Sequence, residues 1–135
     1  MRILTTLLLF LGLSVSHVAQ SLQEPLEAEL EILEEADRLV VSAIFQNNTQ
    51  AFLDYEYRLR VERSGPNGSL SSGQRNDFRA GPDQRVVLAS TDLNRDPADT
   101  YVLRLEILDA KGQVILTDEV IIDGKKKTRT RTRSS

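Results

Sequence analysis

The feature that most constrains this chain is a two-residue alternation of apolar and charged side chains near its middle. The apolar positions are Tyr55, Tyr57, Leu59 and Val61, and the charged positions between them are Glu56, Arg58, Arg60 and Glu62. Successive side chains of an extended strand point to opposite faces of a sheet. The alternation therefore predicts a β-strand with one face in the core and a charged face in water.

Similar patterns recur along the chain between turn-forming residues. Six more segments are predicted as strands: residues 26–32, 39–46, 74–79, 84–91, 101–107 and 114–122. The first also fits a helix, because Leu26, Leu30 and Leu33 have helical spacing, and only its surroundings favour a strand. Residues 64–73 are rich in Ser and Gly and contain Pro66-Asn67-Gly68. This composition predicts a loop.

Seven short strands and no convincing helix predict an all-β fold, an immunoglobulin-like antiparallel β-sandwich. The sequence has no Trp and no Cys, which excludes the Trp-and-disulfide core of antibody domains. We therefore expect an aliphatic core with a few aromatic side chains: Phe45, Phe52, Tyr55, Tyr57, Phe78 and Tyr101. The predicted sandwich domain comprises residues 22–123.

The N-terminal segment predicts export from the cytoplasm. Arg2 precedes an almost wholly apolar run over residues 3–13, and small and polar residues follow. This is the layout of a secretory signal peptide. Residues 1–21 are the predicted signal peptide, with cleavage after Ala19 or after Ser21 and a periplasmic or secreted mature protein. The alternative is an uncleaved membrane anchor, but a span needs about 20 apolar residues. No later segment is predicted to insert stably into a membrane.

The inventory of side chains argues against catalysis. The chain has no Cys, and its only His is His17, which lies in the predicted signal peptide. His and Cys are the usual general base, nucleophile and zinc ligands, so we predict a protein that is not an enzyme and holds no cofactor. Asp92, Asn94 and Asp96 have the spacing of a calcium loop, but Pro97 stands where an EF-hand loop needs Gly. We therefore predict a polar turn there and no metal site.

Charge is divided between the two parts of the mature chain. Residues 24–123 contain all 20 Asp and Glu and only ten of the 17 Lys and Arg, so their net charge is −10. Six basic residues follow in residues 124–135, a tail without apolar residues that is predicted to be disordered. We expect this tail to contact an anionic surface or partner, or the protein's own acidic body. Nucleic acid is not an expected partner, because the tail has no aromatic residue to stack on bases.

An ordered series of residues in the middle of the chain resembles a known family. The strand Tyr57-Arg58-Leu59-Arg60-Val61-Glu62-Arg63-Ser64-Gly65 is followed by Gly68-Ser69, then by Gln74, Phe78 and Ala80-Gly81. This order resembles the small periplasmic curli-assembly inhibitors of the CsgC/CsgH kind, and more closely the cysteine-free CsgH branch. One departure is that Gln74-Arg75-Asn76-Asp77-Phe78 stands where the family is expected to have a Gln-Gly-Gly-Glu-Phe-like stretch.

The resemblance implies a non-enzymatic sandwich that keeps amyloid-forming fibre subunits of curli type from polymerising early. The implied partner is such a subunit. The charged strand face formed by Glu56, Arg58, Arg60 and Glu62 is the hypothesised partner-binding surface, and the alternative is that these are ordinary solvated strand residues. The alternative function is a structural or adhesion module, a minor component of a surface fibre.

Overall fold

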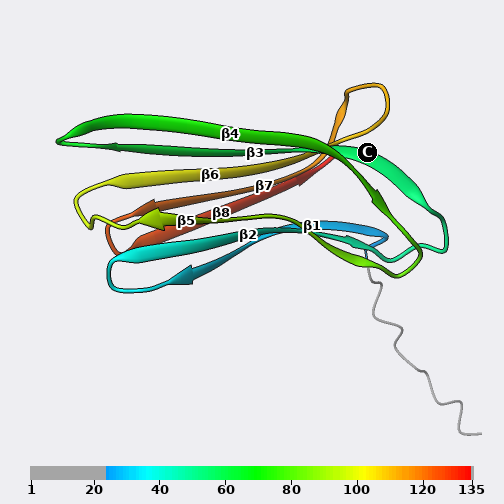
Figure 1. Cartoon of the computed structure of the whole chain (residues 1–135), viewed down its shortest axis with the longest axis horizontal. Helices are drawn as coiled ribbons and strands as arrows, with labels where there is room; N and C mark the ends of the chain where they lie inside the picture. The colour runs from blue at the N-terminus through cyan, green and yellow to red at the C-terminus, as the bar shows by residue number, and fades with distance from the viewer. Residues whose placement is uncertain (1–23, 135) are drawn as a thin grey trace, which may run out of the picture.

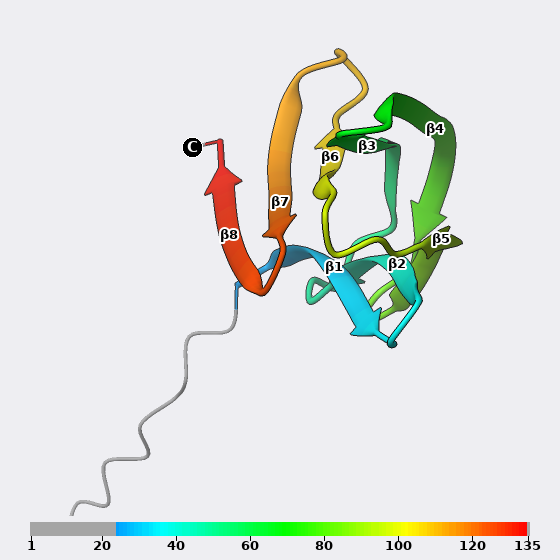
Figure 2. The ribbon, with the colours of Figure 1, turned by 90° about the vertical axis from the view of Figure 1, so that its left-hand side faces the viewer.

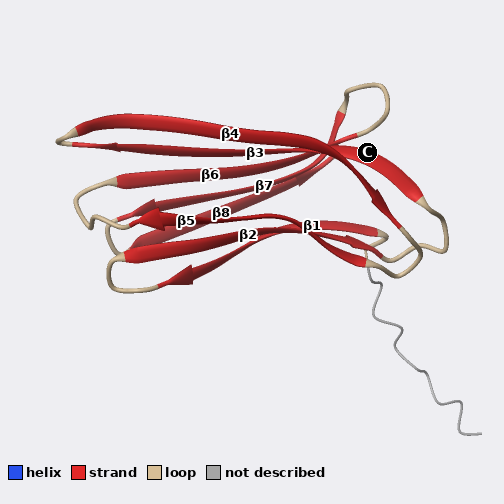
Figure 3. Cartoon of the chain, in the orientation of Figure 1, coloured by secondary structure: helices blue, strands red, loops and turns tan. Residues whose placement is uncertain are grey.

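The computed structural model describes residues 24–134, and the predicted signal peptide lies outside them. Within the described residues the chain forms eight β-strands and no helix (Figures 1 and 3). The strands are β1 (Leu26–Glu34), β2 (Arg38–Asn47), β3 (Leu53–Gly65), β4 (Gly68–Ala80), β5 (Arg85–Asn94), β6 (Thr100–Leu108), β7 (Val114–Asp123) and β8 (Lys126–Arg133). The all-β prediction is confirmed, and the ambiguous first segment is a strand.

Two antiparallel sheets pack face to face (Figure 2). One sheet has the order β1-β2-β5, and the other has the order β4-β3-β6-β7-β8. The core between them is mainly aliphatic, as expected, and its fully buried members include Leu30, Leu39, Val41, Leu103, Leu105, Ile107 and Val120. Phe45 contacts the edges of Tyr55 and Phe78, with ring centroids 6.0 and 5.1 Å apart. Among the described residues no helix is long and apolar enough to cross a membrane.

Phe52 is not part of the core, and its prediction as a core residue is wrong. Its side chain is 63% exposed, because it lies in the loop just before β3, where no strand alternation turns it inward. Its ring packs against Gly81 and under the guanidinium of Arg79, which lies 4.8 Å from the ring centroid. Phe52 therefore covers the β4–β5 turn from outside.

Tyr101, at the start of β6, fastens the β5–β6 loop to the core. Its ring is buried, and its hydroxyl donates a hydrogen bond to the carbonyl of Asn94 at 2.8 Å and accepts one from the amide of Asp96 at 2.9 Å. Such a tyrosine corner is a hallmark of immunoglobulin-like sandwiches. The contact fixes the end of the sandwich over which the β3–β4 hairpin extends (Figure 1).

The predicted loop over residues 64–73 is wrong. β3 and β4 continue in unbroken register to the pair Gly65↔Gly68, and only Pro66 and Asn67 form the turn. Gly68 has a φ of +114°, which favours glycine. A Cβ atom on Gly65 would lie 1.8 Å from Oδ1 of Asp99, so this close approach also requires glycine. The Ser and Gly residues form a strand because β3 supplies a complete row of backbone partners.

The predicted disorder of the basic tail is also wrong, because residues 126–133 form β8 along the edge of β7. Gly124, with a φ of +59°, makes the tight turn between the two strands. Thr128, Thr130 and Thr132 alternate with Arg129, Arg131 and Arg133, and threonine favours strands. The sandwich therefore continues through the tail, and acidic partners on β1 and β7 take the place of apolar burial.

Candidate protein-binding surface

The four predicted binding residues, Glu56, Arg58, Arg60 and Glu62, lie on the outer face of β3. Their neighbours Tyr57, Leu59 and Val61 are buried, as the alternation requires. Arg60 is the most exposed of the four, with 68% of its side chain accessible. The structure therefore brings all four to one solvated face, and their role in binding stays a prediction.

The four residues differ in how closely they are paired with other charged side chains. Glu56 forms an ion pair with Arg75 of β4, whose Nη2 lies 2.7 Å away, and accepts a hydrogen bond from Arg58 Nε at 3.4 Å. Arg60 and Glu62 are joined only loosely, at 3.9 Å. Exposed pairs of this kind contribute about 0–1 kcal/mol each. Arg60 is therefore the cation on this face that is most readily available to a partner.

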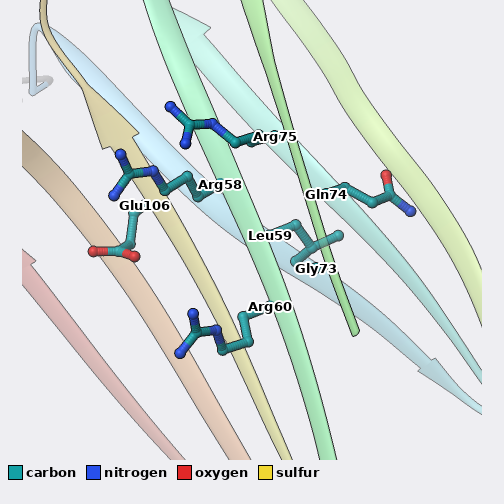
Figure 4. Close-up of a pocket in the computed structure, with 7 residues that line it drawn as sticks. All are labelled: Arg58, Leu59, Arg60, Gly73, Gln74, Arg75 and Glu106. Carbon is teal, nitrogen blue, oxygen red and sulfur yellow. The ribbon is translucent and has the colours of Figure 1, made fainter. Parts of the chain in front are cut away.

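The neighbouring strands add charged residues that the sequence analysis did not assign to this surface. Arg58 lies opposite Glu106 of β6 and Arg75 of β4, and Arg60 lies opposite Arg104 of β6 and Gly73 of β4. All of these except Arg104 border a shallow hollow of about 430 Å³. Its lining residues are Arg58, Leu59, Arg60, Gly73, Gln74, Arg75 and Glu106 (Figure 4). The strand alternation indicated which residues point outward, but the register that joins strands is not visible in a single sequence.

The arginines around the hollow outnumber the carboxylates. Arg58, Arg60 and Arg75 line it, against Glu106 alone. Gly73, the residue of β4 opposite Arg60, has no side chain, so β4 does not cover Arg60 at this position. The site is therefore an open basic surface at the edge of a sheet, suited to the carboxylates of a polypeptide.

The side of the sandwich where β4 and β5 lie is called the open side below. β4 is the terminal strand of its sheet, and β5 is the terminal strand of the other. Every residue of β4 from Gly68 to Asp77 is exposed. The backbone on the outer edge of β4 therefore faces solvent and a prospective partner.

The opposite side, where β1 and β8 lie, is called the closed side (Figure 2). Asp118 of β7 is fully buried there and accepts a hydrogen bond from the Leu30 amide at 2.7 Å and one from Arg131 Nε at 3.2 Å. Arg129 donates to the Leu30 carbonyl at 2.6 Å, and Arg133 donates to the Leu26 carbonyl. Side chains of β7 and β8 thus occupy backbone groups on the outer edge of β1.

The tail consequently has a partner within the chain. The carboxylate of Glu29 on β1 accepts hydrogen bonds from Arg131 at 3.1 Å and from Arg129 at 3.4 Å. Arg133 forms an ion pair with Glu24. Of the alternatives left open by the sequence, contact with the protein's own acidic body is the one that the structure contains. The signal that could have located this strand is the strict Arg/Thr alternation.

The calcium-like spacing is accounted for by local structure. Asp92 and Asn94 belong to β5, and Asp92 lies 3.6 Å from Arg38. Asp96 Oδ1 accepts the Ala98 amide at 2.9 Å, as in an Asx turn. Among residues 24–134 no three His, Cys, Asp or Glu side chains are grouped so that they could hold a metal ion.

Comparison with solved structures identifies the architecture. The curli protein CsgC of E. coli superposes with a TM-score of 0.52 at 12% identity, covering 78% of this chain and 96% of that chain. The fold is CsgC-like. The solution structure of R. palustris CsgH matches with a TM-score of 0.47 at 18% identity, over 80% of this chain and 91% of that chain.

The CsgC-like fold is the extent of what these comparisons establish. No protein-family model matches the sequence, and no curated protein matches it. At 12% identity the likeness to CsgC concerns the path of the chain and not its surface residues. The features of this chain that bear on function are therefore the open side and its charged face.

Proposed function

We propose that the mature protein is a non-enzymatic binding protein outside the cytoplasm that restrains the polymerisation of amyloid-forming fibre subunits of curli type. The observation that carries the proposal is the combination, on a CsgC-like sandwich, of an exposed edge strand, β4, with a basic face beside it. The predicted signal peptide supports the location. The restriction of His to His17 and the lack of Cys support a function in binding.

The physical basis is competition for strand edges. Amyloid grows when a chain adds a strand to an exposed edge through backbone hydrogen bonds. A folded sandwich with a free edge pairs transiently with such a strand before the strand finds another subunit. Charged residues on the outer face, led by Arg58 and Arg60, would then raise the encounter rate and keep a second layer from stacking on the pair.

The alternative is that the protein is a minor structural component of a surface fibre. One observation favours it: both terminal strands of the five-stranded sheet, β4 and β8, have exposed residues throughout most of their length. A component of a growing fibre needs two such edges, whereas an inhibitor needs one. Stoichiometry separates the two functions, because an inhibitor acts well below one copy per subunit and stays in solution.

The test is a fibrillation assay with residues 22–135 at a small fraction of the concentration of a curli-type subunit, followed by thioflavin fluorescence. We expect the lag to lengthen several-fold and the protein to remain in the supernatant. The double variant Arg58→Glu/Arg60→Glu is expected to lose most of this effect. Its matched control is Arg38→Glu/Arg85→Glu, which reverses two exposed arginines of the other sheet.

Two results would count against the proposal. An unchanged lag with the wild-type protein would reject inhibition. Recovery of the protein within washed fibres at a fixed ratio to the subunit would favour the structural alternative. Equal losses in the Arg58→Glu/Arg60→Glu and Arg38→Glu/Arg85→Glu variants would mean that net charge, and not this face, governs the effect.

A further inference from the structure

The backbone of β4 has a fixed orientation toward solvent. Backbone groups of successive strand residues point alternately to the two sides, and in a hairpin with a two-residue turn the flanking pair, here Gly65 and Gly68, exchanges hydrogen bonds. The residues of β4 whose backbone groups form hydrogen bonds with β3 are then the even-numbered ones. The amides and carbonyls of Ser69, Ser71, Gly73 and Arg75 accordingly point away from β3, toward the open side.

The devices that usually protect an edge are missing from the first half of β4. Residues 68–74, Gly-Ser-Leu-Ser-Ser-Gly-Gln, contain no charge and no proline, and the β3–β4 register has no bulge. Natural edges are commonly blocked by charged side chains, proline or bulges. The other edges differ: β8 is basic at every second position, β1 is covered by arginines, and the β2–β5 ladder has a register shift at Ala43/Ile44.

A second hollow lies on the inner face of the same stretch of β4. It has a volume of about 220 Å³ and opens between the β3–β4 hairpin and the end of β5. Its lining combines apolar side chains with polar ones that are mostly paired elsewhere: Val61, Leu70, Leu93 and Tyr101 are apolar, and Arg63, Ser72, Asp92 and Asn94 are polar. Arg63 pairs with Asp99, and Asp92 pairs with Arg38. Leu70 is 59% exposed, which is unusual for a leucine that points toward the core side of a sheet. An added strand beside β4 would bring every second side chain over this hollow.

The outer face of the same stretch is the basic surface already described. Arg58, Arg60 and Arg75 line it beside Gly73 (Figure 4). The remaining side chains of an added strand, which alternate with those over the inner hollow, would lie beside these arginines. The two faces of the edge thus favour different side chains: apolar residues within the sandwich and carboxylates outside it.

We propose that the edge of β4 from Gly68 to Arg75 accepts one extended strand of a partner protein whose sequence alternates apolar and acidic residues. This inference rests on the proposed function in taking that strand from an amyloid-forming subunit. Backbone hydrogen bonds to Ser69, Ser71 and Gly73 would supply affinity. The two hollows would supply selectivity, as in other complexes formed by strand addition.

The direct test uses a probe that does not depend on the fibre subunit. A synthetic seven-residue peptide of alternating Asp and Leu, blocked at both ends, is titrated into ¹⁵N-labelled residues 22–135. Amide shifts are expected to concentrate at Ser69, Ser71 and Gly73. A peptide with Lys in place of Asp should bind at least several-fold more weakly. Ser71→Pro removes an outward amide and should abolish the shifts, whereas the matched control Ser71→Ala keeps that amide and should preserve them.

The outcomes separate this inference from the proposed function. Shifts centred on β5, β8 or the outer face of the three-stranded sheet, or no shifts at millimolar peptide, would overturn it. Protection of the same amides in a dimer of the free protein would also overturn it, because a second copy would then be the occupant. If Ser71→Pro fails to fold, the wild-type shift map alone decides.

The fibrillation assay completes the separation. Peptide binding at β4 without any delay of fibrillation would reject the proposed function and leave the edge site in place. A delay that Ser71→Pro retains in full would reject the edge site and leave the function in place.

Discussion

The two sides of the sandwich differ in how their strand edges are protected: the edge of β1 is covered by side chains, and the edge of β4 is exposed. On the closed side, Asp118, Arg129 and Arg133 bind backbone groups on the outer edge of β1, and Arg131 holds Asp118 and Glu29 in place. On the open side, β4 presents residues 68–74 without charge, proline or bulge. The comparison teaches that a basic strand with no apolar residue can protect an edge when acidic partners are built into the neighbouring strands.

The closed side is held by unequal contacts. Asp118 is fully buried, while the side chains of Arg129 and Arg131 are 30% and 51% exposed. A buried carboxylate that keeps its hydrogen bonds is costly to disturb, whereas a half-exposed arginine exchanges its partner for water. We therefore expect the aspartate, and not the arginines, to dominate the stability of this side.

The largest effect is expected from Asp118→Ala. It removes the acceptor of the Leu30 amide and the partner of Arg131, so the free energy of unfolding should fall by about 3 kcal/mol. Urea denaturation measures this loss. Asp118→Asn keeps an acceptor oxygen and should cost clearly less. A loss under about 1 kcal/mol for Asp118→Ala would show that the closed side does not depend on this carboxylate.

Proline substitution on the open side should distinguish neighbouring residues. The amide of Ser72 faces β3, so Ser72→Pro should lower the free energy of unfolding by about 2 kcal/mol through a lost ladder bond. The amide of Ser71 faces solvent, so Ser71→Pro should change it by less than about 0.5 kcal/mol. Thermal and urea unfolding compare the two variants. Equal losses would mean that the assigned backbone orientation is wrong.

The triple variant Arg129→Gln/Arg131→Gln/Arg133→Gln should remove the side chains that cover the outer edge of β1. Because its ion pairs are partly exposed, the expected loss of stability is about 1–2 kcal/mol. Uncovering the edge of β1 should also make concentration-dependent association stronger than in the wild-type protein, as measured by sedimentation velocity. Replacing Lys125, Lys126 and Lys127 by Gln is the matched control. A triple variant that associates no more than the wild-type protein would show that the arginines do not protect β1.

Only a small effect on stability is expected from Arg58→Glu/Arg60→Glu. Arg60 is exposed and loosely paired, and Arg58 is half-exposed and paired with Glu56, so the free energy of unfolding should change by less than about 1 kcal/mol. Binding of an acidic strand should nevertheless weaken, and the wild-type interaction should weaken as salt rises. A large loss of stability would mean that these arginines mainly support the fold.

The sequence predicted those parts of the fold that follow from alternation. Tyr57, Leu59 and Val61 are buried, and Arg58 and Arg60 are exposed, because a strand with one solvated face has no other arrangement. Residues 126–133 were not predicted as a strand because they contain no apolar residue. Their stability comes from Asp118 and Glu29, which are distant in sequence.

The candidate site was predictable on one strand only. Arg58 and Arg60 belong to the alternating segment, but Arg75 and Gly73 lay within or beside a predicted loop. Ser and Gly have low strand propensity, and a complete hairpin partner overrides it. The hollow on the inner face depends on how far the hairpin extends past β5, which is a matter of tertiary structure.

Amide hydrogen exchange by NMR tests the central claim most directly, because it reports both sides of the sandwich in one experiment. In the free protein, the Leu30 amide should be strongly protected, and the amides of Ser71 and Gly73 should exchange at nearly the rate of an unstructured chain. With monomeric curli-type subunit added, protection should appear at Ser71 and Gly73 while Leu30 stays as it was. Unprotected Leu30, or protection that never appears on β4, would contradict the account.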